Sequence, residues 1–149
     1  MVPLPFTVEP GHVMAFSRAV GGPGPVDSPP EVGTPAPPTF VAVDVQFDPE
    51  HMRGMRPSGV LADTGSAGGS VLHAEQEFEY FAPVRVGDSL TMSHHDGRTW
   101  TKRSRGGGEL RFREILKEYR NAAGDLVVRS RMVLVETSRQ PSPRPDGLT

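Results

Sequence analysis

LHAEQEFEYFAPVRVGDSL, residues 72–90, is the stretch that decides the fold. In its first half apolar and polar side chains alternate, which is typical of a β-strand with one buried face. One face carries Leu72, Ala74, Gln76, Phe78 and Tyr80, and the other carries His73, Glu75, Glu77 and Glu79. After a turn around Pro83, Gly87 and Asp88, a second alternating run begins at Leu90. The stretch therefore predicts two strands at the centre of an antiparallel sheet.

Downstream, residues 110–137 predict another pair of strands less clearly. The apolar side chains of residues 110–119 (LRFREILKEY) recur at helical spacing, so this segment taken alone favours a helix. Residues 126–134 alternate as a strand, and residues 121–124 (NAAG) precede them with a hairpin-like turn. A strand needs a neighbour, and residues 110–120 are the nearest candidate.

Upstream, residues 5–20 predict a short amphipathic helix. Residues 22–38 contain seven of the chain's 16 prolines and predict an extended loop. Residues 39–47 (TFVAVDVQF) are apolar enough to be buried on most sides, and their valines suit a strand as well as a helix. Residues 48–70, rich in Gly, Met and Arg, predict a long loop that is either a mobile insertion or a ligand loop.

Length and composition limit the possible classes of protein. The 149 residues suit one domain, which we place at residues 1–137, followed by a disordered proline-rich tail at residues 138–149. The 16 basic and 18 acidic residues give a net charge of −2, so neither nucleic acid nor a membrane is predicted as a partner. No apolar run approaches the length of a membrane span and no signal peptide is recognisable, so we expect a soluble, cytoplasmic protein.

Common catalytic and metal-binding motifs are missing from the sequence. It has no P-loop, GxSxG, HExxH or GxGxxG segment, and it has no cysteine. His94 and His95 are adjacent on a predicted strand, so their side chains point to opposite faces and cannot easily share a metal. We therefore expect neither a metal nor a cofactor.

The order of the parts resembles a known family, the MaoC-like dehydratases of the hotdog fold, and in particular the FAS1-like dehydratases. The resemblance covers residues 5–137. The residues that carry it are Ala36-Pro37-Pro38-Thr39-Phe40, Leu72-His73, Glu75 to Phe78, Pro83, Gly87-Asp88, Lys102 and Gly106-Gly107-Gly108. It implies an α+β hotdog fold, in which an antiparallel sheet wraps around a central helix at residues 39–47. It also favours a strand, not a helix, at residues 110–119.

Hydratases similar to these add or remove water across the C2–C3 bond of a fatty acyl thioester. They use an Asp and a His in a Gly-Asp-x-Asn-Pro-x-His segment, because a carboxylate and an imidazole on one water can move its proton. The matching frame here is residues 21–27, GGPGPVD. Gly22 stands where the Asp is expected and Asp27 where the His is expected, so both proton-transfer groups are missing.

The resemblance therefore implies a non-catalytic subunit of an enoyl-CoA hydratase or 3-hydroxyacyl-CoA dehydratase. A second MaoC-like hotdog chain would supply the Asp and the His, and an acyl-CoA thioester would be the substrate. Two alternatives stay open. In the first, the chain is a self-sufficient homodimeric hydratase that uses unrecognised groups such as Asp27 or His73. In the second, it is a hotdog protein that binds acyl-CoA without catalysis.

Two groups of residues are candidates for substrate binding. The densest basic stretch, TWTKRSRGGG at residues 99–108, suits the phosphates and adenine of coenzyme A, or is a solvated hairpin tip. The residues of this stretch that would bind coenzyme A are Trp100, Lys102, Arg103 and Arg105. By the resemblance, Thr39 and Phe40 at the start of the central helix line the acyl tunnel, with core packing as the alternative.

Overall fold

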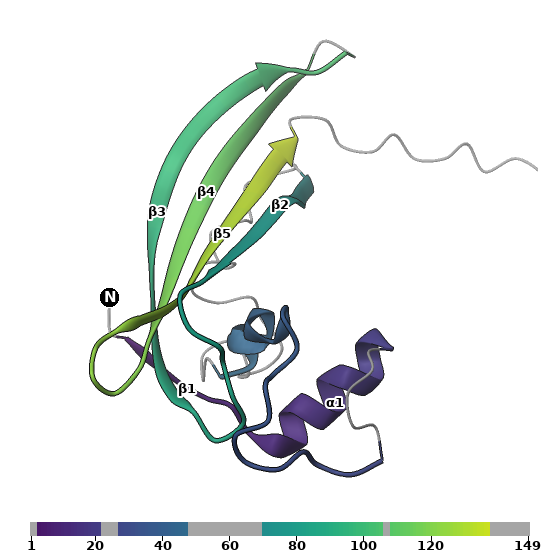
Figure 1. Cartoon of the computed structure of the whole chain (residues 1–149). Helices are drawn as coiled ribbons and strands as arrows, with labels where there is room; N and C mark the ends of the chain where they lie inside the picture. The colour runs from purple at the N-terminus through teal and green to yellow at the C-terminus, as the bar shows by residue number, and fades with distance from the viewer. Residues whose placement is uncertain (1–2, 22–26, 48–69, 106–107, 138–149) are drawn as a thin grey trace, which may run out of the picture.

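The computed structural model describes residues 3–21, 27–47, 70–105 and 108–137, and the structural statements below concern these residues. The elements in chain order are β1 (Leu4–Thr7), α1 (Pro10–Val20), the 3-10 helix η1 (Phe40–Phe47), β2 (Ser70–Tyr80), β3 (Ser89–Arg103), β4 (Glu109–Arg120) and β5 (Leu126–Thr137). Figure 1 shows one curved sheet with both helices beside one of its ends. The predicted loop at 48–70, up to residue 69, and the predicted tail at 138–149 lie outside the described residues.

The five strands form one antiparallel sheet in the order β1-β3-β4-β5-β2. β2 is thus an edge strand, and β5 and β4 separate it from β3 (Figure 1). The prediction that residues 72–90 form the centre of the sheet is therefore wrong for β2. The reason lies in the connection at residues 81–88, which buries Val84 and Val86 in the core and bridges Arg85 to Pro35 instead of making a tight hairpin.

The segment 110–119 forms strand β4, as the family resemblance predicted and against its own helical spacing. β4 lies between β3 and β5, so its backbone groups are paired on both sides. This tertiary context overrides the local preference for a helix. The predicted turn at residues 121–124 is confirmed, because the Asn121 Oδ1 accepts hydrogen bonds from the amides of Ala123 (3.0 Å) and Asp125 (2.9 Å).

The predicted central helix is present as η1, but it is a 3-10 helix. The amide of Phe40 donates to the carbonyl of Pro37 (2.9 Å), and that of Ala42 donates to Thr39 (3.1 Å), each three residues back. The valines at positions 41 and 43 slightly lower the preference for an α-helix, because branching at Cβ crowds the preceding turn. Among the described helices, none is long and apolar enough to cross a membrane.

The main core lies where β1, α1 and η1 meet the sheet. Phe40 is fully buried there, with its ring centroid 6.0 Å from that of Phe6 and 5.7 Å from that of Phe16. Phe6 in turn lies 5.6 Å from the ring of Tyr119 on β4. The buried members of the cluster are Phe6, Val8, Val13, Phe40, Val41, Val84, Val86, Leu90, Met92, Tyr119, Val127 and Val128. This packing fixes η1 against one face of the sheet.

A β-bulge interrupts β2 between His73 and Glu75. His73 pairs with Leu134 on β5 and Gln76 pairs with Met132, two residues away on the same face of β5. The extra residue therefore turns the His73 side chain onto the face that carries Gln76 and that looks toward η1. The sequence pattern had placed His73 on the glutamate face, and that prediction is wrong.

The face of the sheet turned away from η1 carries cross-strand ion pairs. At their centre is Glu114 on β4, whose side chain is only 6% exposed. The backbone amide of Arg98 donates to its carboxylate (3.0 Å), and so does the Arg131 guanidinium. These bonds hold the pKa of Glu114 at about 2, against the opposing effect of burial. Arg131 also pairs with Glu75 on β2 (2.7 Å), which ties the edge strand to the sheet.

Replacing Glu114 by Gln is expected to weaken the fold mainly above mildly acidic pH. A lowered pKa contributes stability that is present above the ordinary value of 4.5 and is lost as the pH falls toward about 2. We expect a loss of about 1 to 3 kcal/mol near neutral pH, shrinking in acid. Urea unfolding across this pH range measures it. The control is Glu109→Gln, since the Glu109 side chain is 52% exposed. If Glu114→Gln lowers the free energy of unfolding by the same amount at all pH values, the lowered pKa assigned to Glu114 is contradicted.

Candidate functional site

A cavity of about 290 Å³ opens where η1 faces β2, β4 and β5, and we call it the η1 cavity. Its size is near the lower end of the range for small-molecule sites. The apolar part of its lining consists of Ala42, Phe78, Met132 and Leu134. The polar part consists of Asp44, His73, Gln76, Lys117, Tyr119 and Ser130. The η1 cavity thus combines apolar walls with a cluster of polar groups.

A buried ion pair between Asp44 on η1 and Lys117 on β4 lies in this cluster. The Lys117 Nζ donates to the Asp44 Oδ2 at 2.6 Å, and the two side chains are 10% and 2% exposed. The Tyr119 hydroxyl lies 3.0 Å from the same Oδ2 and 3.2 Å from the carbonyl of Val41. Burial, and then the charge of Asp44, raises the pKa of Tyr119 well above its usual value, so this hydroxyl stays protonated and donates.

The second carboxylate oxygen of Asp44, Oδ1, is buried and has no hydrogen-bond partner within the described part of the chain. A buried acceptor without a partner is uncommon in proteins, because its lost hydration is not replaced. Asp44 lines the η1 cavity, but this oxygen itself has almost no accessible surface.

Two histidines lie near the ion pair. His73 lines the η1 cavity, and its Nε2 is 3.0 Å from the carbonyl oxygen of Glu75. His94 on β3 pairs in register with Lys117, and burial, followed by the Lys117 charge, lowers its pKa, so it is neutral near neutral pH. Both imidazoles are chemically suited to proton transfer. Asp44, however, already accepts two hydrogen bonds from protein groups on its Oδ2.

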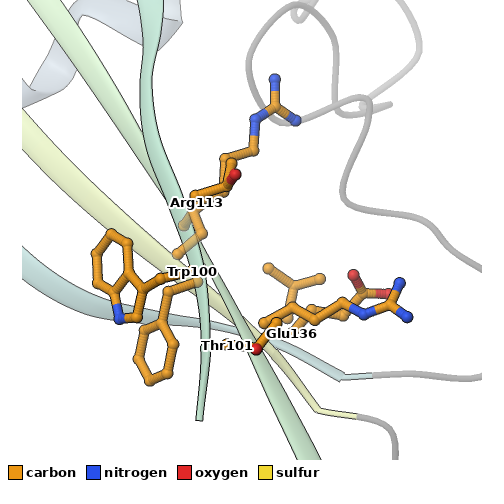
Figure 2. Close-up of a pocket in the computed structure, with 9 residues that line it drawn as sticks. Trp100, Thr101, Arg113 and Glu136 are labelled. Atoms are coloured by element: carbon orange, nitrogen blue, oxygen red, sulfur yellow. The ribbon is translucent and has the colours of Figure 1, made fainter.

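A second cavity, of about 410 Å³, lies farther along the same face of the sheet, and we call it the strand-end cavity. It is lined by Val71, Thr99, Trp100, Thr101, Arg111, Phe112, Arg113, Leu134 and Glu136. Figure 2 shows Thr101 and Glu136 on one side of the strands and the Trp100 ring on the other. The Trp100 and Phe112 rings stack at 5.1 Å with an angle of 2° between their planes. Leu134 lines both cavities.

The structure separates the two predicted groups of binding residues. Of the basic stretch, Trp100 lines the strand-end cavity. The Lys102 Nζ lies 5.4 Å from the centroid of the Phe112 ring, and the side chains of Arg103 and Arg105 are exposed. Their contact with coenzyme A stays a prediction.

At the other end of the molecule, Thr39 is exposed and Phe40 is fully buried in the core. Neither lines the η1 cavity or the strand-end cavity. An acyl-binding role for these two residues also stays a prediction. In the frame that matches the hydratase motif, Gly22 lies outside the described residues and Asp27 is exposed.

The buried pair of Asp44 and Lys117 was not predicted from the sequence. One signal was present, because Asp44 is the single charged residue in the apolar run TFVAVDVQF. A lone carboxylate in a buried segment needs a cationic or hydrogen-bonding partner. The sequence did not indicate that Lys117 is this partner, because Lys117 lies in residues 110–119, whose apolar side chains recur at helical spacing.

Comparison with known proteins identifies a family model that covers most of the chain. Residues 2–130 match the family model described as FAS1-like, dehydratase domain region. The chain is 38% identical over 91 residues to a UPF0336 protein of Clavibacter michiganensis and 33% identical over 99 residues to one of Streptomyces avermitilis. Each alignment covers 60% of this chain, and the chain spans 60% of the length of these relatives.

Solved structures show the same fold at low identity. The ChsH1-ChsH2 complex of Mycobacterium tuberculosis matches with a TM-score of 0.62 and 19% identity, over 98% of this chain and 88% of that one. The HadBC (3R-hydroxyacyl-ACP dehydratase) complex of the same organism matches with a TM-score of 0.57 and 21% identity. That match covers 90% of this chain and 91% of the other. R-hydratase PhaJ1 of Pseudomonas aeruginosa matches with a TM-score of 0.54 and 14% identity, over 99% of this chain and 90% of the other. These likenesses confirm the predicted hotdog fold.

Proposed function

Because the chain belongs to the FAS1-like dehydratase family, we propose that it is the non-catalytic hotdog subunit of an enoyl thioester hydratase or 3-hydroxyacyl thioester dehydratase. In this role it shapes the pocket for the acyl chain, while a MaoC-like partner chain supplies the Asp and the His that move the proton. The assembly is expected to work in the cytoplasm, without a cofactor.

The observation that carries this proposal is the composition of residues 21–27. Where related hydratases have an acid and an imidazole, this chain has Gly22 and Asp27. Glycine has no side chain to transfer a proton, and the carboxylate at the histidine position is not the imidazole that the motif uses for proton transfer. The η1 cavity supports the acyl-binding part of the role, because apolar side chains form much of its lining.

The sheet offers a place for a second hotdog chain. β2 pairs with β5 on one side only, and within the described residues its other edge has no strand beside it. Such an edge can pair with a strand of another chain through backbone hydrogen bonds. Two of the similar solved structures are complexes named for two components, HadBC and ChsH1-ChsH2, which favours a pair of unlike hotdog chains.

The first test is hydration of crotonyl-CoA by this chain with and without a candidate partner. The partner is a MaoC-like protein that retains the complete Gly-Asp-x-Asn-Pro-x-His segment, ideally encoded by a neighbouring gene. We expect almost no turnover by this chain alone, and turnover by a purified complex of the two. The control complex carries Asn in place of the partner's catalytic Asp and should be inactive. Robust turnover by this chain alone would refute the subunit role.

A self-sufficient hydratase is the second candidate, and one observation favours it. The bulge in β2 brings His73 into the same cavity as Asp44. If this candidate is right, the chain alone hydrates crotonyl-CoA, and His73→Gln removes that activity without unfolding the protein. Binding of acyl-CoA without turnover, in every combination of chains, would instead identify a binding protein.

The predicted contact with coenzyme A is tested by replacing Lys102, Arg103 and Arg105 together with Ala. These side chains are exposed, so each lost phosphate contact is expected to cost about 1 kcal/mol or less. Titration calorimetry with acyl-CoA at two salt concentrations measures the loss, and added salt should mimic it. Arg18→Ala, on α1, controls for the change of charge. Unchanged affinity in the triple variant would identify the stretch as a solvated hairpin tip.

A further inference from the structure

Two rows of side chains cross the sheet near the ends of β3 and β5, on the face that looks toward η1. The first row consists of Thr101, Arg111, Glu136 and Val71, and the second, two residues along each strand, of Thr99, Arg113, Leu134 and His73. Residues paired in register on neighbouring strands share a face of the sheet. All of them except His73 line the strand-end cavity, and Leu134 and His73 line the η1 cavity. The two cavities therefore adjoin at Leu134.

The polar side chains of the η1 cavity bond mainly to one another. Lys117 and Tyr119 donate to Asp44, and the Gln76 Nε2 donates to the Ser130 Oγ at 2.8 Å. These groups satisfy each other, so they place few demands on a ligand, and the apolar walls of the same cavity remain suited to an acyl chain.

The guanidinium groups of the strand-end cavity pair instead with carboxylates outside its lining. The Arg111 Nε donates to Glu109 at 2.9 Å, and Arg113 donates to Asp96 at 2.8 Å. The side chains of Glu109 and Asp96 are 52% and 64% exposed. Such exposed ion pairs contribute little, whereas a bidentate bond between arginine and phosphate is strong. A phosphate can therefore compete with these carboxylates for both arginines.

The rest of the strand-end lining is mixed in character. Thr99 and Thr101 offer hydroxyl groups that both donate and accept, and Val71 and Leu134 offer apolar surface. In Figure 2 Thr101, Glu136 and the Arg113 guanidinium lie on one side of the strands, opposite the Trp100 ring. With two guanidinium groups and one carboxylate, the lining is positive overall. It suits a ligand with amides, a short apolar section and an anionic end.

We propose that the strand-end cavity binds the phosphopantetheine arm of the acyl thioester, with Arg111 and Arg113 on its phosphate. The arm carries amides, a pair of methyl groups and a terminal phosphate, which match this lining in kind. The inference rests on the proposed function. The thioester then lies at Leu134, near the free edge of β2, with the acyl chain in the η1 cavity and the arm running the other way.

The test compares octanoyl pantetheine with octanoyl phosphopantetheine by titration calorimetry, on the full chain and on its assembly with the partner. The octanoyl group has no double bond, so neither probe can be hydrated during the measurement. We expect the phosphate to raise the affinity about tenfold, because charge-assisted bonds to guanidinium are strong. In the variant with Arg111→Gln and Arg113→Gln, this gain should disappear, while octanoyl pantetheine binds as before.

The matched control is the variant with Arg120→Gln and Arg129→Gln. It removes the same charge from two arginines that are each 44% exposed and line neither cavity. The control should keep the gain in affinity from the phosphate. Circular dichroism of both variants checks that the fold is intact, so that a lost gain reports on binding.

Two further probes distinguish the sources of the arm, since coenzyme A and carrier proteins both present it. If the source is coenzyme A, octanoyl-CoA binds more tightly than octanoyl phosphopantetheine, and replacing Lys102, Arg103 and Arg105 with Ala removes that difference. If the source is a carrier protein, the octanoyl carrier protein binds more tightly than octanoyl-CoA. In either case the affinity should fall in the Arg111 and Arg113 variant, which supports the inference.

The remaining results overturn the inference or the proposed function. Equal affinity for the probes with and without phosphate overturns the inference, and so does a phosphate gain that survives in the Arg111 and Arg113 variant. No binding of any probe, by the chain or by its assembly, also overturns it. A phosphate gain that depends on both arginines, without hydration by the assembly, contradicts the proposed function alone. Hydration by the assembly without this gain contradicts the inference alone.

Discussion

Replacing Lys117 by methionine is expected to destabilise the protein by about 3 to 5 kcal/mol. The substitution keeps most of the side-chain volume, but it leaves the charge of Asp44 buried with only the Tyr119 hydroxyl as a donor. A buried charge that loses its counter-ion is far more costly than the loss of an exposed ion pair. Urea unfolding followed by circular dichroism measures the difference directly.

The double variant, in which Asp44→Leu accompanies Lys117→Met, separates charge from packing. Its stability should return to within about 1 kcal/mol of the original protein, because no unpaired charge is left in the interior. A further comparison is Arg120→Met, which breaks an exposed pair with Glu118 (2.7 Å) and should cost less than about 1 kcal/mol. A loss below about 1 kcal/mol for Lys117→Met alone would show that Asp44 is not held as a buried charge.

Replacing Phe40 by alanine is expected to cost about 3 to 5 kcal/mol, the usual range for removing a large buried aromatic side chain. Its ring is fully buried between Phe6 and Phe16, so the substitution leaves a cavity in the main core and loosens η1. Thermal unfolding measures the loss. The neighbouring control is Thr39→Ala, which should change stability by less than about 0.5 kcal/mol because Thr39 is exposed.

The same pair of variants tests the acyl-tunnel role that the family resemblance implies for both residues. Weaker acyl binding by a stable Phe40→Ala protein would favour that role. A large loss of stability with unchanged binding in the folded fraction would identify Phe40 as a core residue. The buried contacts with Phe6 and Phe16 lead us to expect the second outcome.

Much of the fold could be predicted from the sequence, but not from periodicity alone. Alternation correctly identified β2 and β5, and the turn at residues 121–124 followed from its residue types. At residues 110–119 periodicity pointed to a helix, and the family resemblance was needed to predict β4. The edge position of β2 was not visible, because local pattern does not reveal which strands pair when a longer connection such as residues 81–88 joins them.

The η1 cavity was harder to foresee than the fold. The bulge at His73 has no signature in the alternating pattern, yet it decides which face the imidazole occupies. Asp44 meets Lys117 only because η1 packs against a face of the sheet where its middle strand, β4, carries Lys117, which is tertiary information. The basic stretch at residues 99–108 was conspicuous in the sequence because charge clusters are easy to see, whereas a single buried charge is not.

The ion pair between Asp44 and Lys117 also constrains how this protein can evolve. The two residues are 73 positions apart in the chain, and losing either charge first passes through an unstable intermediate protein. A single mutation at one site is therefore expected to be purged unless the other has already changed. Divergent lineages of the family should keep both charges or replace both with apolar residues, and chains with only one of them should be rare.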